Sequence, residues 1–233
     1  MVSHYRHLPS ASEMTYIVSS GALNSTHSLT GIYLDADASM TTHVTKSASS
    51  CFAALRQIRA IRRSLIRPVL LSLIVSLVVS RLEYGNATLS GSPSYMFDKL
   101  QSVLNAAALI FLKRRFKSVT PLLRDLHWLR VPQRVEYKLS VLVYRCLHYL
   151  APEYLCDELR RVADISSRQR LRSSSTSALI VPPTRLSTVG DRAFPTAASG
   201  IWNSLPLHVT SAPSLQTFKK RLKPFLFSRS FPS

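Results

Sequence analysis

Between residues 46 and 149 apolar side chains recur at steps of three and four residues, and prolines divide this stretch into segments. Steps of this size place side chains on one face of an α-helix, so each segment can bury one side and leave the other in water. Proline lacks a backbone N–H and therefore begins or breaks a helix. The segmentation predicts helices over 46–67 and 69–82, a helix that begins after Ser92, a short one from Thr120 and a longer one from Pro132.

The apolar faces of these segments predict which side chains form the core. The most apolar window, Val69–Val79, is about half as long as a membrane span and contains Ser72 and Ser76, so we expect a buried helix there. The side chains expected in the core of the next two long helices are Met96, Leu100, Val103, Leu104, Ala107 and Phe111, and then Val135, Leu139, Leu142, Val143, Cys146 and Tyr149.

The segments that flank this helical part have other compositions. Residues 1–27 are polar and show no period, which predicts poor order. The β-branched and aromatic residues of Leu29–Leu34 predict one short strand, and Asp35 begins a loop. Arg and Ser dominate residues 160–177, which is typical of a mobile basic linker.

Residues 178–233 are expected to form a small C-terminal unit. Its pattern predicts a strand at 179–181, a helix near 192–204 and a basic amphipathic helix from Ser214 to about Phe227. The chain is therefore predicted to be mainly α: a helical bundle with a short N-terminal β remnant and a small, basic, α-rich C-terminal unit. The expected divisions are 1–27, 28–45, 46–159, 160–177 and 178–233.

The balance of charge points to a polyanionic partner. Thirty Lys and Arg residues stand against twelve Asp and Glu, which leaves a formal charge of +18. Such a surface attracts RNA or DNA first. An anionic membrane is the second candidate, but the basic residues are spread over several predicted helices and not gathered beside one long apolar span.

Clusters of basic residues are the candidate contacts with nucleic acid. Arg donates forked hydrogen bonds to phosphate oxygens, and few acidic residues lie near these clusters; the alternative is a solvated surface. The candidate nucleic-acid-binding residues are Arg56, Arg59, Arg63 and Arg67, then Lys113, Arg114, Arg115 and Lys117, then Arg168, Arg170 and Arg172, and finally Lys219, Lys220, Arg221 and Lys223.

Other polar groupings give weaker indications. Asp35 and Asp37 could face the same side of a strand as magnesium ligands, but a solvated turn explains them equally well. Cys146, His148 and Cys156 do not have the spacing of a zinc finger. Since there is no C-x-x-C pair and no secretory signal, we expect an intracellular protein of the nucleus or cytoplasm, without metal, cofactor or small-molecule substrate.

The pair His127 and Trp128 has two interpretations. Its rings could stack on a base, but the apolar neighbours Leu126 and Leu129 favour a wedge in a helical core. We therefore expect both rings to pack inside the protein.

Several phrases of the sequence resemble the region downstream of the polymerase palm in reverse transcriptases of non-LTR retrotransposons, of the jockey-like and chicken-repeat kind. The most specific phrase is TPLLRDLHWL at Thr120–Leu129, with Arg134 after it. The other matching phrases follow the same order and lie at 29–44, 81–86, 100–108, 151–155, 171–173, 190–194, 202–206 and 218–223.

The resemblance implies an RNA-directed DNA polymerase in which 28–45 is the edge of the palm and 46–159 is a thumb-like domain. The resemblance also implies that the adjacent aspartates that bind magnesium lie upstream of the segment that begins at Leu29. In agreement with this, no Asp–Asp or Asp–Glu pair follows an aromatic-containing strand here. Two-metal phosphoryl transfer needs carboxylates around both ions. We therefore expect no catalytic residue and no nucleotide synthesis.

This sequence departs from the family's usual wording at Gly85, Leu104, Leu109 and Arg130, where Cys, Gln, Arg and Pro are common. Pro195 and Gly200 fall in or beside an expected helix, where both residue types are unfavourable. These positions predict a weakened C-terminal unit.

The expected function is that of a non-catalytic C-terminal fragment of a retrotransposon RNA-directed DNA polymerase. It would bind RNA or an RNA–DNA hybrid through the backbone, without reading the sequence. Two alternatives remain open: a decayed reading frame with no function of its own, and a basic amphipathic protein that lies on a membrane surface.

Overall fold

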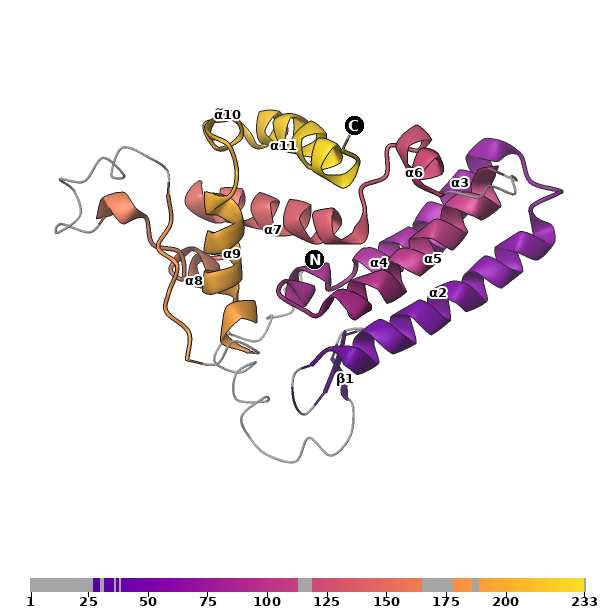
Figure 1. Ribbon diagram of the computed structural model, residues 1–233, viewed down its shortest axis with the longest axis horizontal. Helices are drawn as coiled ribbons and strands as arrows, with labels where there is room; N and C mark the ends of the chain where they lie inside the picture. The colour runs from indigo at the N-terminus through magenta and orange to yellow at the C-terminus, as the bar shows by residue number, and fades with distance from the viewer. Residues whose placement is uncertain are drawn as a thin grey trace, which may run out of the picture.

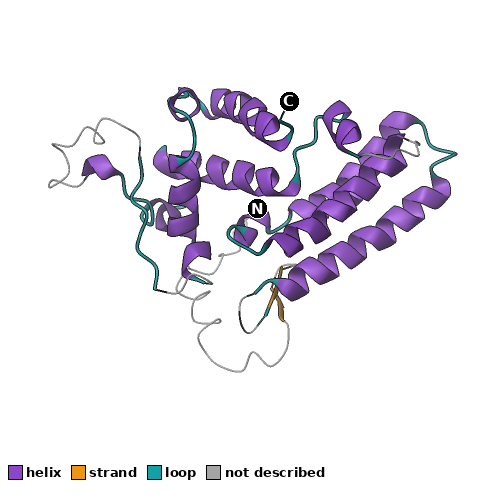
Figure 2. Ribbon diagram, in the orientation of Figure 1, coloured by secondary structure: helices purple, strands orange, loops and turns teal. Residues whose placement is uncertain are grey.

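Helices dominate the part of the chain that the structure describes, which confirms the prediction of a mainly α fold (Figure 1, Figure 2). The structure is a computed structural model and describes residues 27–29, 32–35, 37, 39–112, 119–164, 178–185 and 189–232. The predictions for residues 1–26 and for most of the basic linker lie outside the described residues.

The elements follow one another in this order: strands β1 (His27–Leu29) and β2 (Ile32–Leu34), helices α2 (Thr41–Ile61) and α3 (Arg67–Ile74), π-helix η1 (Val75–Val79), α4 (Ser80–Glu83), 3-10 helix η2 (Asn86–Leu89), α5 (Ser94–Leu112), α6 (Thr120–Asp125), α7 (Val131–Leu147), α8 (Glu153–Cys156), η3 (Val162–Asp164), η6 (Gly190–Arg192), α9 (Phe194–Asn203), α10 (Leu207–Thr210) and α11 (Leu215–Ser230).

The N-terminal β segment folds back on itself. β1 and β2 pair in antiparallel register, with Leu29 opposite Ile32. The prediction of a single strand over 29–34 was therefore wrong, because this segment supplies parts of two strands and each is the other's partner.

Helix α2 begins earlier and ends earlier than the periodicity predicted. A carboxylate oxygen of Asp35 accepts hydrogen bonds of 3.0 Å from the backbone N–H of Thr42 and from the Ser39 hydroxyl. This carboxylate satisfies a donor in the first turn that the helix itself leaves unpaired, so the helix starts at Thr41. Because it ends at Ile61, Arg63 follows the helix and Arg67 opens α3.

The apolar stretch after Pro68 is buried on one side only. Leu70, Ile74 and Val78 lie in the core, whereas Val69 and Val75 are each 42% exposed. The prediction of a buried helix was wrong for this outer side, and η1 widens the helix in its middle. Within the described segments no helix is both long enough and apolar enough to cross a bilayer.

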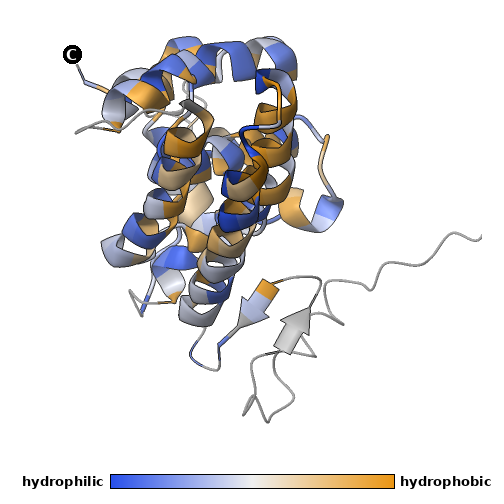
Figure 3. Ribbon diagram, turned by 90° about the vertical axis from the view of Figure 1, so that its right-hand side faces the viewer, coloured by the Kyte–Doolittle hydropathy of each residue, from blue (hydrophilic) through white to orange (hydrophobic). Residues whose placement is uncertain are grey.

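Helix α5 packs against both α2 and α3 and contributes side chains to the first hydrophobic cluster. The six side chains predicted for its core are all buried, because they share one helical face. Figure 3 shows that hydrophobic and hydrophilic residues occur together on the helices that face the viewer. This pattern is required of amphipathic helices around a shared core.

Helix α7 joins this cluster to a second one that it forms with α9 and α11. The ring of Phe218 stacks on Tyr144 and Trp202, with centroids 4.6 and 5.8 Å apart, and the Tyr144 hydroxyl donates to the Ala212 carbonyl at 3.0 Å. Of the residues predicted for the core side of α7, Leu142 is half-buried. The prediction for Tyr149 was wrong, because the helix ends at Leu147 and Tyr149 is 87% exposed.

The C-terminal unit is attached to the chain before the linker by backbone hydrogen bonds. The N–H of Val162 donates to the Ala178 carbonyl at 3.0 Å, and the N–H of Ile180 donates to the Arg160 carbonyl at 2.9 Å. The strand predicted at 179–181 is only one β-bridge, because the amide side chain of Asn203 takes up both the N–H and the carbonyl of Leu179 at 2.8 Å.

The two residues that were expected to weaken α9 differ in their effect. Pro195 lies in the first turn, where a missing N–H removes no intrahelical bond. Gly200 is exposed inside the helix, and a Cβ built there would meet nothing within 4 Å. Only the glycine therefore costs stability.

Gly200→Ala is expected to raise the free energy of unfolding by about 0.5–1 kcal/mol, since alanine restricts the unfolded chain without a clash in the helix. Urea unfolding with an unchanged slope would measure it. The matched control is Gly85→Ala, at φ +71°, where a Cβ would lie 3.3 Å from Ile32. This change is expected to destabilise the protein, and equal signs for the two substitutions would contradict the argument.

Candidate nucleic-acid interface

The first predicted cluster of arginines lies at the C-terminal end of α2 and just beyond it. Arg56 and Arg59 are exposed on the helix, and Arg63 is exposed after its end. Arg67 is exposed at the first residue of α3, where its guanidinium lies 5.3 Å from the centroid of the Phe111 ring. The sequence pattern predicted that the four arginines lie on one face of a single helix. That prediction was wrong, because α2 ends between Arg59 and Arg63.

The last predicted cluster lies on α11. Lys219, Lys220, Arg221 and Lys223 are all exposed, while Phe218 and Leu222 of the same helix are buried. Arg221 donates to the His208 carbonyl at 2.7 Å, which holds this guanidinium beside α10. The predicted clusters at 113–117 and 168–172 lie outside the described residues.

None of these described cations is used in an ion pair within the described segments. The ion pairs there join Arg134 and Lys138 to Glu83, and Arg229 to Glu136. Unpaired exposed cations leave the positive field of the surface uncancelled. Both clusters are therefore available to phosphate.

The structure does not bring the two clusters together. Figure 1 shows α2 and α11 at opposite sides of the fold with α5 and α7 between them, and the packing runs from α2 to α5, from α5 to α7 and from α7 to α11. A polyanion bound at one cluster would therefore lie on the other side of the fold from the second cluster.

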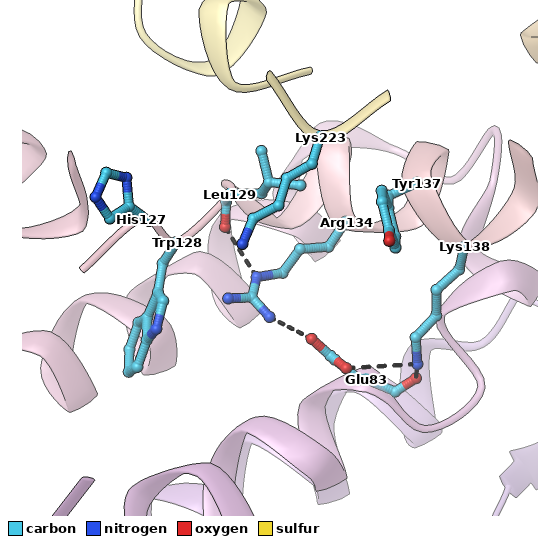
Figure 4. Close-up of a pocket in the computed structure, with 8 residues that line it drawn as sticks. All are labelled: Glu83, His127, Trp128, Leu129, Arg134, Tyr137, Lys138 and Lys223. Atoms are coloured by element: carbon cyan, nitrogen blue, oxygen red, sulfur yellow. Dashed lines mark hydrogen bonds and ion pairs between the residues drawn. The ribbon is translucent and has the colours of Figure 1, made fainter. Parts of the chain in front are cut away.

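A pocket of about 250 Å³ extends the α11 cluster toward α7. Figure 4 shows Lys223 of α11 reaching toward Arg134, with Trp128 on one side and Tyr137 on the other. Glu83 lies across the pocket from Lys223 and is the acidic residue among the described groups that line it. The pocket is thus basic with aromatic walls.

The charges inside this pocket are not equivalent. Glu83 accepts from the Arg134 guanidinium, its second carboxylate oxygen lies 3.8 Å from the Lys138 ammonium, and its backbone carbonyl accepts from the same ammonium. Burial lowers the pKa of Arg134 and of Lys138, and Glu83 opposes this in both cases. Two cations are therefore committed to Glu83, while Lys223 is the one available to an anion.

The aromatic pair beside the pocket follows the prediction only in part. Trp128 is half-buried against the first cluster, and the Arg134 guanidinium lies 5.9 Å from its ring. His127 is exposed instead, at φ +51°, with its ring 5.8 Å from that of Phe227. The expectation that both rings are buried was wrong for His127, because α6 ends before it.

The candidate metal ligands have other roles. Asp35 and Asp37 accept hydrogen bonds in the loop before α2; burial tends to raise the pKa of Asp35, but hydrogen bonds from Thr42 and Ser39 bring it below its usual value. No group of three or more His, Cys, Asp or Glu side chains that could hold a metal occurs in the part of the chain that the structure describes.

Cys146 and the adjacent Asp157 and Glu158 lie away from both pockets. Burial, and then the neighbouring Cys156 thiol, raise the pKa of Cys146 to about 11, so its thiolate is scarce at neutral pH. Asp157 and Glu158 are adjacent, but they follow the helical turn α8 and not a strand, and both are exposed.

The sequence pattern did not predict that Arg134 and Lys138 of α7 line a pocket together with Lys223 of α11. They are four residues apart on α7, a spacing that puts both on one helical face. That signal was present, but it did not show that α11 would pack beside this face. No family model, curated protein or solved structure matches the chain, so the candidate interface stands on the geometry of its own residues.

Proposed function

We propose that this chain binds RNA or an RNA–DNA hybrid through the sugar-phosphate backbone, as the C-terminal part of a retrotransposon RNA-directed DNA polymerase. The proposal rests on one observation: the described cations of the α2 and α11 clusters are exposed and take part in no ion pair of the described segments. Such cations release counterions from phosphate and position the backbone, but they do not read bases.

Binding is expected to weaken steeply with salt. Replacing Lys219 and Lys220 by glutamine should reduce the slope of log K against log salt by about 0.7 for each phosphate of single-stranded RNA that the variant no longer neutralises. Fluorescence anisotropy at several salt concentrations measures the slope. Arg229→Gln removes one positive charge from a residue already paired with Glu136 and should leave the slope nearly unchanged, in contrast to each single replacement of Lys219 or Lys220.

A second pair of substitutions tests the α2 side. Arg56→Gln with Arg59→Gln should also lower the slope, independently of the α11 change, because the two clusters lie on different sides of the fold. Binding that is absent in the unaltered protein, or insensitive to salt, would contradict the proposal.

The proposed role includes no synthesis by this chain. With a primer, a template, nucleotides and magnesium, incorporation is expected to stay at background, since two-metal transfer needs clustered carboxylates. Incorporation above that of a no-protein control would overturn this part while leaving the binding measurement intact.

One observation favours the alternative of a decayed reading frame. The outer side of α3 and η1 exposes Val69 and Val75, and Ile66 just before α3 is 69% exposed. Exposed apolar surface of this kind promotes association of the protein with itself. A soluble protein with one cooperative thermal transition would speak against the decayed frame, and aggregation without a transition would support it.

A further inference from the structure

A second pocket, of about 390 Å³, lies beside the N-terminal half of α2 and belongs to neither predicted cluster. Its described lining comes from β2, α2, and α4 with the residue that follows it. It contains two cations, Lys46 and Arg81, and no carboxylate lines it among the described residues. The pocket is therefore suited to an anionic group.

The two cations are positioned but not neutralised. The Lys46 ammonium lies 4.2 Å from the centroid of the Tyr33 ring, and the Arg81 guanidinium donates to the Ser50 hydroxyl at 2.8 Å. Neither takes part in an ion pair of the described segments. A guanidinium has five N–H donors, so most of those on Arg81 remain for a phosphate.

Aromatic rings form the walls of the same pocket. Tyr33 is half-buried, and Tyr84 is 47% exposed. A tyrosine ring at a basic pocket can stack on a nucleobase of any kind, because every base has a flat face. This favours a nucleotide over an inorganic anion.

A buried histidine also lines this pocket. His43 is only 4% exposed, and its Nδ1 has no hydrogen-bond partner within the described segments. Burial lowers the pKa of His43, while a hydrogen bond with the Tyr84 backbone and the charge of Asp35 oppose this. A neutral imidazole adds no charge, so the positive charge of the pocket comes from Lys46 and Arg81.

We propose that this pocket holds one unstacked nucleotide of a single-stranded RNA, with the phosphate between Lys46 and Arg81 and the base against Tyr84. This inference rests on the proposed function and names where one nucleotide is held. The cations attract the phosphate, and the tyrosine ring favours a nucleoside over other anions.

The test is photocrosslinking of the full chain to an oligouridylate that contains thiouridine, followed by mass spectrometry of the crosslinked peptides. A crosslink at Tyr84 or Tyr33 is expected. Arg81→Gln and Lys46→Gln should each lower its yield about tenfold at limiting RNA, the loss expected for one charged hydrogen bond. Lys46 is exposed, so its replacement does not disturb the core.

Lys99→Gln is the matched control. Lys99 is exposed, as Lys46 is, and it donates to a hydroxyl of α2, as Arg81 does. The acceptor of Lys99 is the Thr45 hydroxyl at 3.0 Å, and Lys99 does not line the pocket. Its replacement should leave the crosslink yield unchanged. An equal loss for Lys99→Gln and Lys46→Gln would assign the effect to general charge and overturn the pocket.

The outcomes separate this inference from the proposed function. Salt-dependent RNA binding without a crosslink at either tyrosine overturns the pocket alone, and absence of RNA binding overturns both. Competition by oligoglutamate as effective as that by unlabelled oligouridylate of equal charge would show a general anion site, and it would also overturn the nucleotide assignment.

Discussion

Phe218→Ala is expected to lower the free energy of unfolding by about 3–5 kcal/mol. The ring is fully buried and lies between Tyr144 of α7 and Trp202 of α9, so its removal leaves a cavity where three helices meet. A loss of this size is a large fraction of the roughly 5–15 kcal/mol that stabilises a typical domain. Urea unfolding followed by tryptophan fluorescence measures it.

Two variants calibrate this result. Phe218→Leu leaves a smaller cavity and should lose less stability, which keeps the test usable if the alanine variant does not fold. Phe225→Ala removes the same ring from the half-buried side of α11 and should have a smaller effect. Equal losses at positions 218 and 225 would contradict the view that α11 is held mainly through Phe218.

Glu83→Gln is expected to destabilise the protein by about 2–3 kcal/mol. The Arg134 side chain is only 12% exposed and would lose its anion, and a buried charge without a partner is costly. The effect should be below the value for a fully buried pair because the Glu83 side chain is 34% exposed. Chemical unfolding of the single variant gives the number.

The double variant Glu83→Leu with Arg134→Met separates pairing from desolvation. Only Lys138, whose side chain is 38% exposed, loses a carboxylate partner in it, so it should recover most of the loss, as hydrophobic replacements of ion pairs often do. Arg229→Gln, at the more exposed pair with Glu136, should cost less than about 1 kcal/mol. Additive losses in the double variant would mean that the two side chains act independently.

Much of the helical fold was predictable because proline and periodicity are local signals. Thr120 and Pro121 begin α6, Pro132 lies in the first turn of α7, and Ser214 caps α11 by accepting a 3.2 Å hydrogen bond from the N–H of Thr217. These features depend on a few consecutive residues. Each could therefore be identified without knowledge of the tertiary structure.

The missed features depend on residues far apart in the sequence. Asn203 takes the place of a second strand beside Leu179, from which it is 24 positions away. The burial of Tyr144 depends on Phe218 and on the Ala212 carbonyl, which no periodicity on α7 reveals. Long-range contacts of this kind were not visible in the local pattern.

In the candidate site, too, the features set by local sequence were predicted and those set by tertiary packing were not. Composition and clustering identified Arg56, Arg59 and Lys223 as exposed cations, because exposure follows from charge on an amphipathic helix. The two pockets were not predicted, since Lys223 meets Arg134, and Lys46 meets Arg81, only when separate helices pack together.

The backbone bonds between 160–162 and 178–180 also bear on how this polypeptide can change in length. They close the intervening segment at its base, so the two flanks stay attached whatever lies between them. Each doubling of the length of a closed loop costs only about 0.6 kcal/mol. Insertions, deletions or a single protease cut in this Arg- and Ser-rich stretch should therefore leave α9 and α11 packed on α7. The stretch between residues 162 and 178 should accept changes in length or an inserted tag with little loss of stability.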